Sequence, residues 1–275
     1  MMYKYSGIIF LLAFLLFLFL EVLCVYLIMP LPGSQQSDWV EIAYALNRYI
    51  WLSRVVFGAL LLWTTSIIFR GQKLWSKMSV ILAGLILIVL IYCTTFVARA
   101  DKIFLQPETK LMKPTIESTI DTSRLILGVA LHGEASAYPI YLIGYHHQVC
   151  DTVGGIAIMV TYCTMCRTGT VFQPMVQGRH EIFGLVGMDQ YNALFQDAST
   201  HSWWRQATGE CCAGKLKGTQ LPVVSTEQMS IAAWVAKHPN THILQPDPKF
   251  AKKYEQLSSY EKGVDKLEFS AKWRK

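Results

Sequence analysis

Charge is scarce in this sequence, since only 16% of its 275 residues are charged whereas 52% are hydrophobic. A chain of this balance is not disordered, and it does not have the composition of an ordinary soluble enzyme. The positive charges form no dense stripe, which excludes nucleic acid as an expected partner. A serine nucleophile elbow, a phosphate loop, a dinucleotide fingerprint and the paired histidines of metalloproteases are also lacking.

The shortage of charge belongs to the first hundred residues. Residues 1–99 hold seven Lys/Arg and three Asp/Glu, which leaves 18 and 16 for residues 100–275. Three apolar runs occupy residues 7–29, 50–69 and 78–98, and a helix of about 20 residues crosses the hydrocarbon layer. The first run is too long for a signal peptide and no clean cleavage site follows it. We therefore predict three retained transmembrane helices in contact with the lipid bilayer.

The charges of the loops predict the orientation of these helices. Lys4 precedes the first run, and loop 70–77 has three basic residues and no acidic one. Loop 30–49 has two acidic residues and one arginine. The positive-inside rule then places the N-terminus in the cytoplasm and residue 100 onward outside.

Two opposite charges interrupt the apolar runs. Glu21 lies about 8 residues from the outer end of the first helix, and Arg54 about 4 residues from the outer end of the second. Their depths differ by only about 6 Å at 1.5 Å per residue, so an ion pair within the membrane is possible. The alternative is that Arg54 extends to the interface while Glu21 faces a helix contact.

After a tether at residues 100–122, short strand patterns replace the membrane runs. Residues 123–246 are expected to form a β-rich (α+β) domain, and residues 247–275 a charged tail. The expected strands include 125–131, 242–244 and a hairpin at 149–160 around Gly154-Gly155. Residues 226–237 are expected to be a helix capped by Thr226. The predicted fold class is thus a membrane protein with three transmembrane helices and a β-rich outer domain.

The seven cysteines divide between the two parts. Cys24 and Cys93 fall in the membrane runs, where they are expected to act as small apolar residues. The outer domain has five, which cannot all pair within one chain. Three of them are candidates for disulfides: Cys150, Cys211 and Cys212.

The remaining two, Cys163 and Cys166, form a CxxC motif at the end of an apolar strand. Two thiols at this spacing can bind one soft metal ion, act as a redox dithiol or form a structural disulfide. The charge of Arg167 is expected to favour a thiolate at Cys166. Arg167 also excludes a c-type haem attachment, which needs histidine there. A structural zinc site would need a second ligand pair, for which only His201 and the adjacent Cys211-Cys212 are present.

Other residues near the motif suit metal chemistry. His146 and His147 follow an apolar segment, and neighbours on a strand point to opposite faces, so only one of them can face a given site. Met159, Met165 and Met175 could offer thioethers to Cu(I), although core packing is the alternative. Of Trp203 and Trp204, one is expected in the core and the other at the surface.

Several motifs in order resemble the bacterial family called "domain of unknown function 3179". They are 133–140, His146, 151–155 and 161–169, followed by Tyr191-Asn192, Trp204 and 208–210. The resemblance covers residues 115–245 and not the three helices. It implies no activity, but it singles out His146, Asp151 and the CxxC, and it implies a bacterial inner-membrane protein with a periplasmic domain. Arg167 departs from the pattern, and Cys150, Cys211 and Cys212 are additions to it.

These observations lead to three hypotheses, and they leave open whether the protein is an enzyme. The first is a soft-metal site, preferably copper or another transition metal, with Cys163, Cys166 and His146 as ligands and with Asp151 as the residue that orients the imidazole. The second is a thiol–disulfide oxidoreductase in which Cys163 attacks and Cys166 resolves. The third is a non-catalytic subunit or assembly factor whose helices bind other subunits of a membrane complex.

Overall fold

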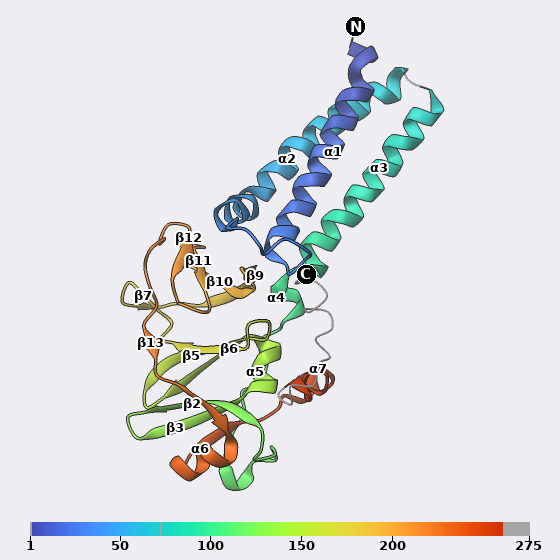
Figure 1. The fold of residues 1–275 in the computed structure, drawn as a ribbon. Helices are drawn as coiled ribbons and strands as arrows, with labels where there is room; N and C mark the ends of the chain where they lie inside the picture. Colours follow the sequence, from blue (N-terminus) through green and yellow to red (C-terminus); the bar gives the residue numbers. More distant parts are fainter. Residues whose placement is uncertain (1, 72, 261–275) are drawn as a thin grey trace. The chain divides into compact units, whose positions relative to one another are not determined.

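The computed structural model describes residues 2–71 and 73–260. The chain divides into two compact units, Met1–Ile103 and Phe104–Lys275, which are called here the membrane unit and the outer unit. Figure 1 shows the first as a helical bundle and the second as a mainly β structure. The predicted fold class is therefore confirmed.

The membrane unit consists of three long helices, α1 (Met2–Ile28), α2 (Val40–Gly71) and α3 (Leu74–Tyr92). By length and composition, each is able to cross a membrane. Many large apolar side chains face outward, with Leu62 73% exposed and Ile88 65% exposed, as expected for surfaces that contact lipid. The three predicted helices are thus present.

Helix α2 begins ten residues before the apolar run that predicted it. The added turns mix apolar residues with Glu41, Asn47 and Arg48, and a search for uninterrupted apolar runs does not detect such a segment. Glu41 stands in the first turn, where a negative charge stabilises the helix dipole. Between α1 and α2, the Ser34 hydroxyl donates to the carbonyl of Met29 at 2.6 Å and the Gln35 amide to that of Leu27 at 3.1 Å. These bonds satisfy carbonyls that the end of α1 leaves without partners.

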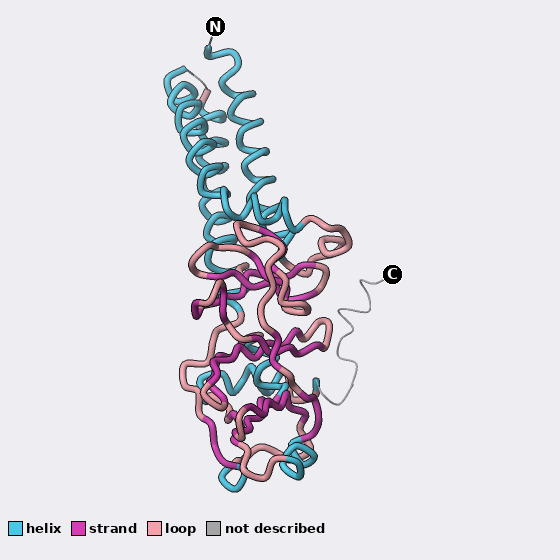
Figure 2. Tube along the Cα trace, turned by 90° about the vertical axis from the view of Figure 1, so that its left-hand side faces the viewer, coloured by secondary structure: helices cyan, strands magenta, loops and turns pink. Residues whose placement is uncertain are grey.

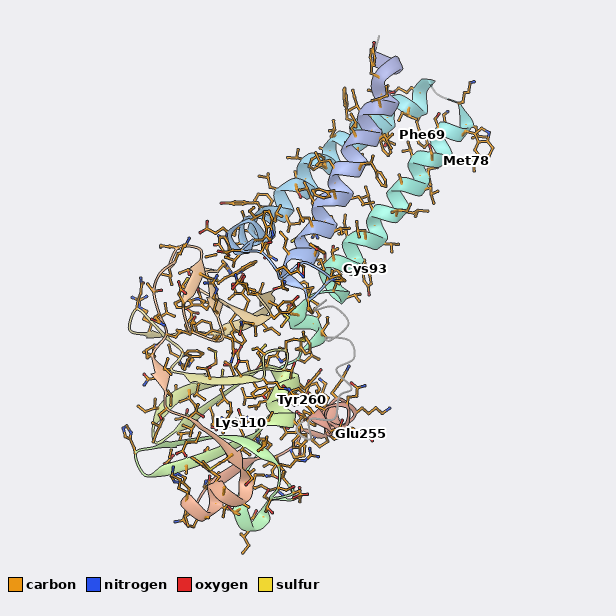
Figure 3. All side chains as sticks on the ribbon, viewed as in Figure 1. Phe69, Met78, Cys93, Lys110, Glu255 and Tyr260 are labelled. Atoms are coloured by element: carbon orange, nitrogen blue, oxygen red, sulfur yellow. The ribbon has the colours of Figure 1, made fainter. Side chains whose placement is uncertain are left out.

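The third span ends in an irregular turn. The π-helix η1 (Cys93–Val97) continues α3, and the short helix α4 (Ala100–Ile103) follows it. Cys93, labelled in Figure 3, marks the residue at which the regular helix gives way.

The outer unit contains three sheets and a two-stranded ribbon. The five-stranded sheet has the order β1 (Met112–Pro114), β15 (His242–Leu244), β3 (Glu134–Pro139), β2 (Leu125–Leu131) and β14 (Glu227–Ser230). One four-stranded sheet has the order β13 (Val223–Val224), β6 (Thr168–Phe172), β5 (Ile156–Cys163) and β4 (Gln148–Val153). The other has the order β12 (Cys211–Ala213), β11 (Trp203–Arg205), β10 (Asn192–Asp197) and β9 (Phe183–Asp189). The ribbon pairs β7 (Met175–Val176) with β8 (Arg179–His180).

The sheets follow one another along the outer unit (Figures 1 and 2). The main core joins the first two sheets with α5 (Ile140–His146) and α7 (Ala251–Gln256), and its fully buried residues include Val129, Tyr138 and Val160. On the other face of the five-stranded sheet, Trp234 of α6 (Ile231–Lys237) packs against Ile126 and Ile243. Two 3-10 turns complete the unit, η2 (Thr115–Glu117) and η3 (Pro248–Phe250).

Several sequence predictions of strands are confirmed. Strands 125–131 and 242–244 have the predicted bounds, and the hairpin 149–160 appears as β4 and β5. Its turn residues Gly154 and Gly155 have φ values of +56° and +75°, which glycine adopts without strain.

The helix expected at residues 226–237 is half wrong. Residues 227–230 instead form β14, which pairs with β2, and the helix begins only at Ile231 with Ser230 as its cap. The segment expected as a tether also carries structure, since β1 lies within it and pairs with β15. Of the charged tail, residues 261–275 lie outside the described residues, whereas α7 places Tyr254 in the core.

Candidate functional site

The two cysteines of the CxxC motif lie where β5 turns into β6. Cys163 is the last residue of β5 and is paired in register with Thr168, the first residue of β6. The four residues between them form the turn, and Arg167 closes it with a φ of +54°. Cys163 is fully buried and Cys166 is half-buried. We call Cys163 and Cys166 the thiol pair.

A second turn, from a different sheet, covers the thiol pair. Gln190 and Tyr191 connect β9 to β10 with φ values of +47° and +64°. The sulfur of Cys163 lies 3.4 Å from the carbonyl oxygen of Tyr191, and the sulfur of Cys166 lies 3.2 Å from Oδ1 of Asn192. The site is therefore built from residues about 25 positions apart in the sequence.

The hydrogen bonds around the two sulfurs make them unequal. The Cys163 thiol donates to the sulfur of Cys166, and the hydroxyl of Thr168 lies 2.9 Å from that sulfur. These donors lower the pKa of Cys166 to about 6, with the bond from Cys163 as the largest cause. The same bond, together with burial, raises the pKa of Cys163 well above its usual value. Of the two thiols, the more exposed one, Cys166, is therefore the more acidic.

The buried amide of Gln206 fixes the position of Thr168. Its Nε2 donates to the carbonyl of Thr168 at 3.3 Å and to the hydroxyl of Thr161 at 3.1 Å. Its backbone N–H donates to the carbonyl of Ala193 in β10. Gln206 is fully buried, so it links the two four-stranded sheets directly beneath the thiol pair.

Arg167 does not play the expected role at Cys166. Its guanidinium lies 5.0 Å from the centre of the Tyr260 ring, and its charge is not among the causes that lower the pKa of Cys166. Tyr260 in turn donates to the carbonyl of Thr164 at 2.8 Å, and Figure 3 labels it beside α5. The backbone of the turn, with φ positive at Arg167, directs this side chain to the tyrosine. The thiolate is thus stabilised by neutral donors.

His146 has both ring nitrogens engaged away from the thiol pair. Its Nδ1 bonds to the carbonyl of Leu105 and must donate, so its Nε2 accepts from the hydroxyl of Tyr254 at 2.7 Å. Burial lowers the pKa of His146, which keeps the ring neutral. The structure does not bring this histidine to the sulfurs as a ligand.

Asp151 does not orient His146. Its Oδ2 accepts from the buried hydroxyl of Tyr138 at 2.7 Å, and its Oδ1 pairs with Lys110. Burial and the neighbouring Asp151 raise the pKa of Tyr138 well above its usual value. Because Lys110 comes from the segment before β1, this ion pair fastens that segment to β4.

The other three outer cysteines are free thiols on two strands. Cys150 is exposed on β4, whereas Cys211 and Cys212 are buried on β12. Burial raises the pKa of Cys211 to about 11 and that of Cys212 to about 12, so both stay protonated. Within residues 2–71 and 73–260, no three His, Cys, Asp or Glu side chains are grouped so that they could hold a metal ion.

The expectation of one exposed tryptophan is wrong. Trp203 and Trp204 are only 1% and 2% exposed. Their indole N–H groups donate to Gln196 at 3.1 Å and to Asp197 at 2.9 Å. Both rings therefore belong to the core of the third sheet.

In the membrane unit, the pair expected between Glu21 and Arg54 is formed. Nε of Arg54 lies 2.7 Å from one carboxylate oxygen of Glu21, and Nη2 lies 2.9 Å from the other. The hydroxyl of Thr94 adds a third bond to the carboxylate at 2.9 Å. This is the two-pronged geometry that gives arginine–carboxylate pairs their strength.

Sequence reasoning did not assign Thr168 and Asn192, whose side chains contact the sulfur of Cys166, or Gln206, which holds Thr168. The signal for Asn192 was present, because Tyr191-Asn192 is one of the motifs that resemble the family pattern. No local pattern marks Gln206, whose role depends on the docking of two sheets.

A family model described as "Protein of unknown function (DUF3179)" matches residues 107–273 of this chain. Neither the curated proteins nor the solved structures contain a match.

Proposed function

The chain belongs to the DUF3179 family, whose function is unknown, and we propose that it is a membrane-anchored thiol–disulfide exchange protein that acts through the thiol pair. The observation that carries the proposal is the inequality of the two sulfurs. Cys166 is half-buried, lies 2.9 Å from the hydroxyl of Thr168 and has a lowered pKa of about 6, whereas Cys163 is fully buried and has a raised pKa. Thiol–disulfide exchange needs two unequal cysteines, because one attacks as a thiolate and the other then resolves the mixed disulfide.

The chemistry balances with a protein disulfide as the partner. The Cys166 thiolate attacks one sulfur of the partner's disulfide, and the other sulfur leaves as a thiolate and takes a proton from solvent. Cys163 then loses its proton to solvent and attacks the Cys166 sulfur, which expels the partner's remaining thiolate. Two electrons pass to the partner, and a Cys163–Cys166 disulfide forms. The roles of the two cysteines are the reverse of those expected from the sequence alone.

The location proposed for this chemistry is the outer face of a bacterial inner membrane. The basic loop 70–77 and Lys4 favour the cytoplasm for the N-terminus, so three crossings bring the outer unit into the periplasm. Disulfides form and persist in that compartment, so partners with disulfides are present there.

A soft-metal site remains the competing proposal, and the geometry favours it less. His146 has both ring nitrogens in other bonds, which leaves two sulfurs as ligands. Two thiolates alone suit Cu(I) better than zinc, which takes four ligands.

The test uses the purified full-length chain and its two single-cysteine variants. We expect iodoacetamide to modify Cys166 with a midpoint near pH 6, and Cys163→Ser to accumulate a mixed disulfide with a disulfide-bonded peptide. The reduction potential of the pair should be above about −300 mV, the upper limit for structural disulfides. An ordinary midpoint near pH 9 with no mixed disulfide contradicts the proposal. If the reduced chain binds Cu(I) stoichiometrically and the bound metal blocks alkylation of the cysteines, the result supports the metal site instead.

A further inference from the structure

A small cavity lies within the membrane unit, between one end of α1, the first turns of α2 and the π-helix η1. Its volume is about 80 Å³, enough for two or three water molecules or one polar group of a ligand. The residues that carry the argument are Glu21, Asn47, Arg54, Thr94 and Thr95. We call this space the polar cavity.

The charges in the polar cavity are already balanced. The side chain of Glu21 is only 1% exposed, and its carboxylate accepts two hydrogen bonds from Arg54 and one from Thr94. Arg99, which also lines the cavity, is paired with Asp101 at 2.8 Å. A further full charge would be unfavourable here, so the cavity suits a neutral ligand.

Hydrogen-bond donors nevertheless remain. Of the three guanidinium nitrogens of Arg54, Nη1 has no acceptor among the described residues. The buried hydroxyl of Thr95 has no hydrogen-bond partner. The hydroxyl of the neighbouring Thr94, in the same π-helical turn, bonds to Glu21 and to the carbonyl of Ile91, so only Thr95 of the two threonines keeps an unused donor. Unused donors inside a membrane call for a ligand with an acceptor oxygen.

An apolar groove adjoins the polar cavity. The groove has a volume of about 380 Å³ and runs along α1 and α2 beside Leu20, Leu46, Val56 and Phe57. Ile50 lines both spaces. A molecule with a polar head and an apolar tail could therefore occupy the two together.

We propose that the polar cavity and the groove bind a neutral, lipid-soluble molecule through a carbonyl oxygen. That oxygen accepts hydrogen bonds from Arg54 and Thr95, and the apolar tail lies in the groove past Ile50. Water could satisfy the donors but would not fill the groove, whose walls are apolar. Two sources share this chemistry: an isoprenoid quinone and the ester of a neutral glyceride. The proposal is independent of the thiol pair.

The test is native mass spectrometry of the full-length chain in detergent, titrated with a decyl-substituted benzoquinone or with dioctanoylglycerol. We expect one molecule of one probe to bind per chain, which identifies the source. Thr95→Val removes a donor and should weaken binding about fivefold. Ile50→Trp fills the junction of the two spaces and should weaken binding at least about tenfold. Ile88→Trp, a matched change at a side chain outside both spaces, should leave binding unchanged.

Two results overturn the proposal. One is that neither probe binds the folded wild-type chain, and the other is that Ile50→Trp and Ile88→Trp bind equally well. A circular dichroism spectrum at 222 nm shows whether each variant retains its helices. Cys166→Ser should bind the probe like the wild type, so a failure of the exchange function and a failure of this site give different results.

Discussion

At the scale of single residues, the thiol pair depends on neutral donors. The lowered pKa of Cys166 follows mainly from bonds that Cys163 and Thr168 make to one sulfur, whereas the guanidinium of Arg167 lies over the ring of Tyr260. Bonds of this kind act over short distances and fixed directions. Small changes at the donors should therefore have larger effects than the removal of a full charge.

Replacement of Thr168 by valine should raise the pKa of Cys166 by about 1, because the thiolate loses a hydroxyl donor while the shape of the side chain is kept. The pH dependence of iodoacetamide modification, followed by mass spectrometry of the Cys166 peptide, measures this change. Arg167→Gln is the matched control and should leave the midpoint unchanged. A larger shift of the midpoint in Arg167→Gln than in Thr168→Val would show that Arg167 is the main cause of the lowered pKa of Cys166.

His147 should make the stability of the outer unit depend on pH. The ring is buried and stacked on Phe104 at 4.3 Å, and burial lowers its pKa from 6.5 to about 4. The unfolded chain therefore binds a proton that the folded chain does not, and stability falls as the pH drops from about 6.5 towards 4. The full loss is on the order of 3 kcal/mol.

Thermal unfolding of the full-length chain at pH 7 and pH 5 measures this dependence. His147→Asn should show a smaller fall in Tm, since asparagine tolerates the φ of +61° at this position and does not titrate. An equal fall in both proteins would assign the effect to other groups.

At the scale of elements, β2 and α6 pack closely at Gly128. A Cβ added at Gly128 would lie 2.5 Å from the ring of Trp234, whose N–H is held by Thr241 at 2.9 Å. Nothing lies within 4 Å of the corresponding position at Gly184 in β9. Two strand glycines thus differ only in their surroundings.

Gly128→Ala should destabilise the outer unit by about 1–3 kcal/mol, because the tryptophan must move out of a filled core. Gly184→Ala should be neutral or slightly stabilising, since alanine restricts the unfolded chain. Chemical unfolding of the two variants, followed by tryptophan fluorescence, gives the comparison. The interpretation fails if Gly184→Ala costs as much as Gly128→Ala.

The elements also show what the sequence alone could predict. The apolar runs and strand 125–131 follow from local patterns, so their positions could be predicted. The segment 227–230 could not, because its pairing with β2 overrides the helical pattern that continues into α6. The same holds for the thiol pair. Its two cysteines are visible as a motif, but Asn192 and Gln206 reach it only through the packing of separate sheets.

At the scale of the whole molecule, the proposed orientation in the membrane predicts which thiols a reagent can reach from outside the cell. Cys150 is exposed on the outer unit and offers a natural reporter. In spheroplasts, a membrane-impermeant maleimide should label Cys150 without lysis. In a Cys150→Ser/Cys166→Ser background, a cysteine introduced by Ser76→Cys should react only after lysis, because the three basic residues of loop 70–77 favour the cytoplasm for this loop. The opposite pattern would place the outer unit in the cytoplasm, where dithiols are kept reduced.

The bond between Gln206 and Thr168 also bears on how the protein is made. Cys163 and Cys166 precede Gln206 by some 40 residues in the sequence, so the amide that fixes Thr168 joins the site only when the two four-stranded sheets dock. The surroundings of the Cys166 sulfur are therefore complete only in the folded outer unit.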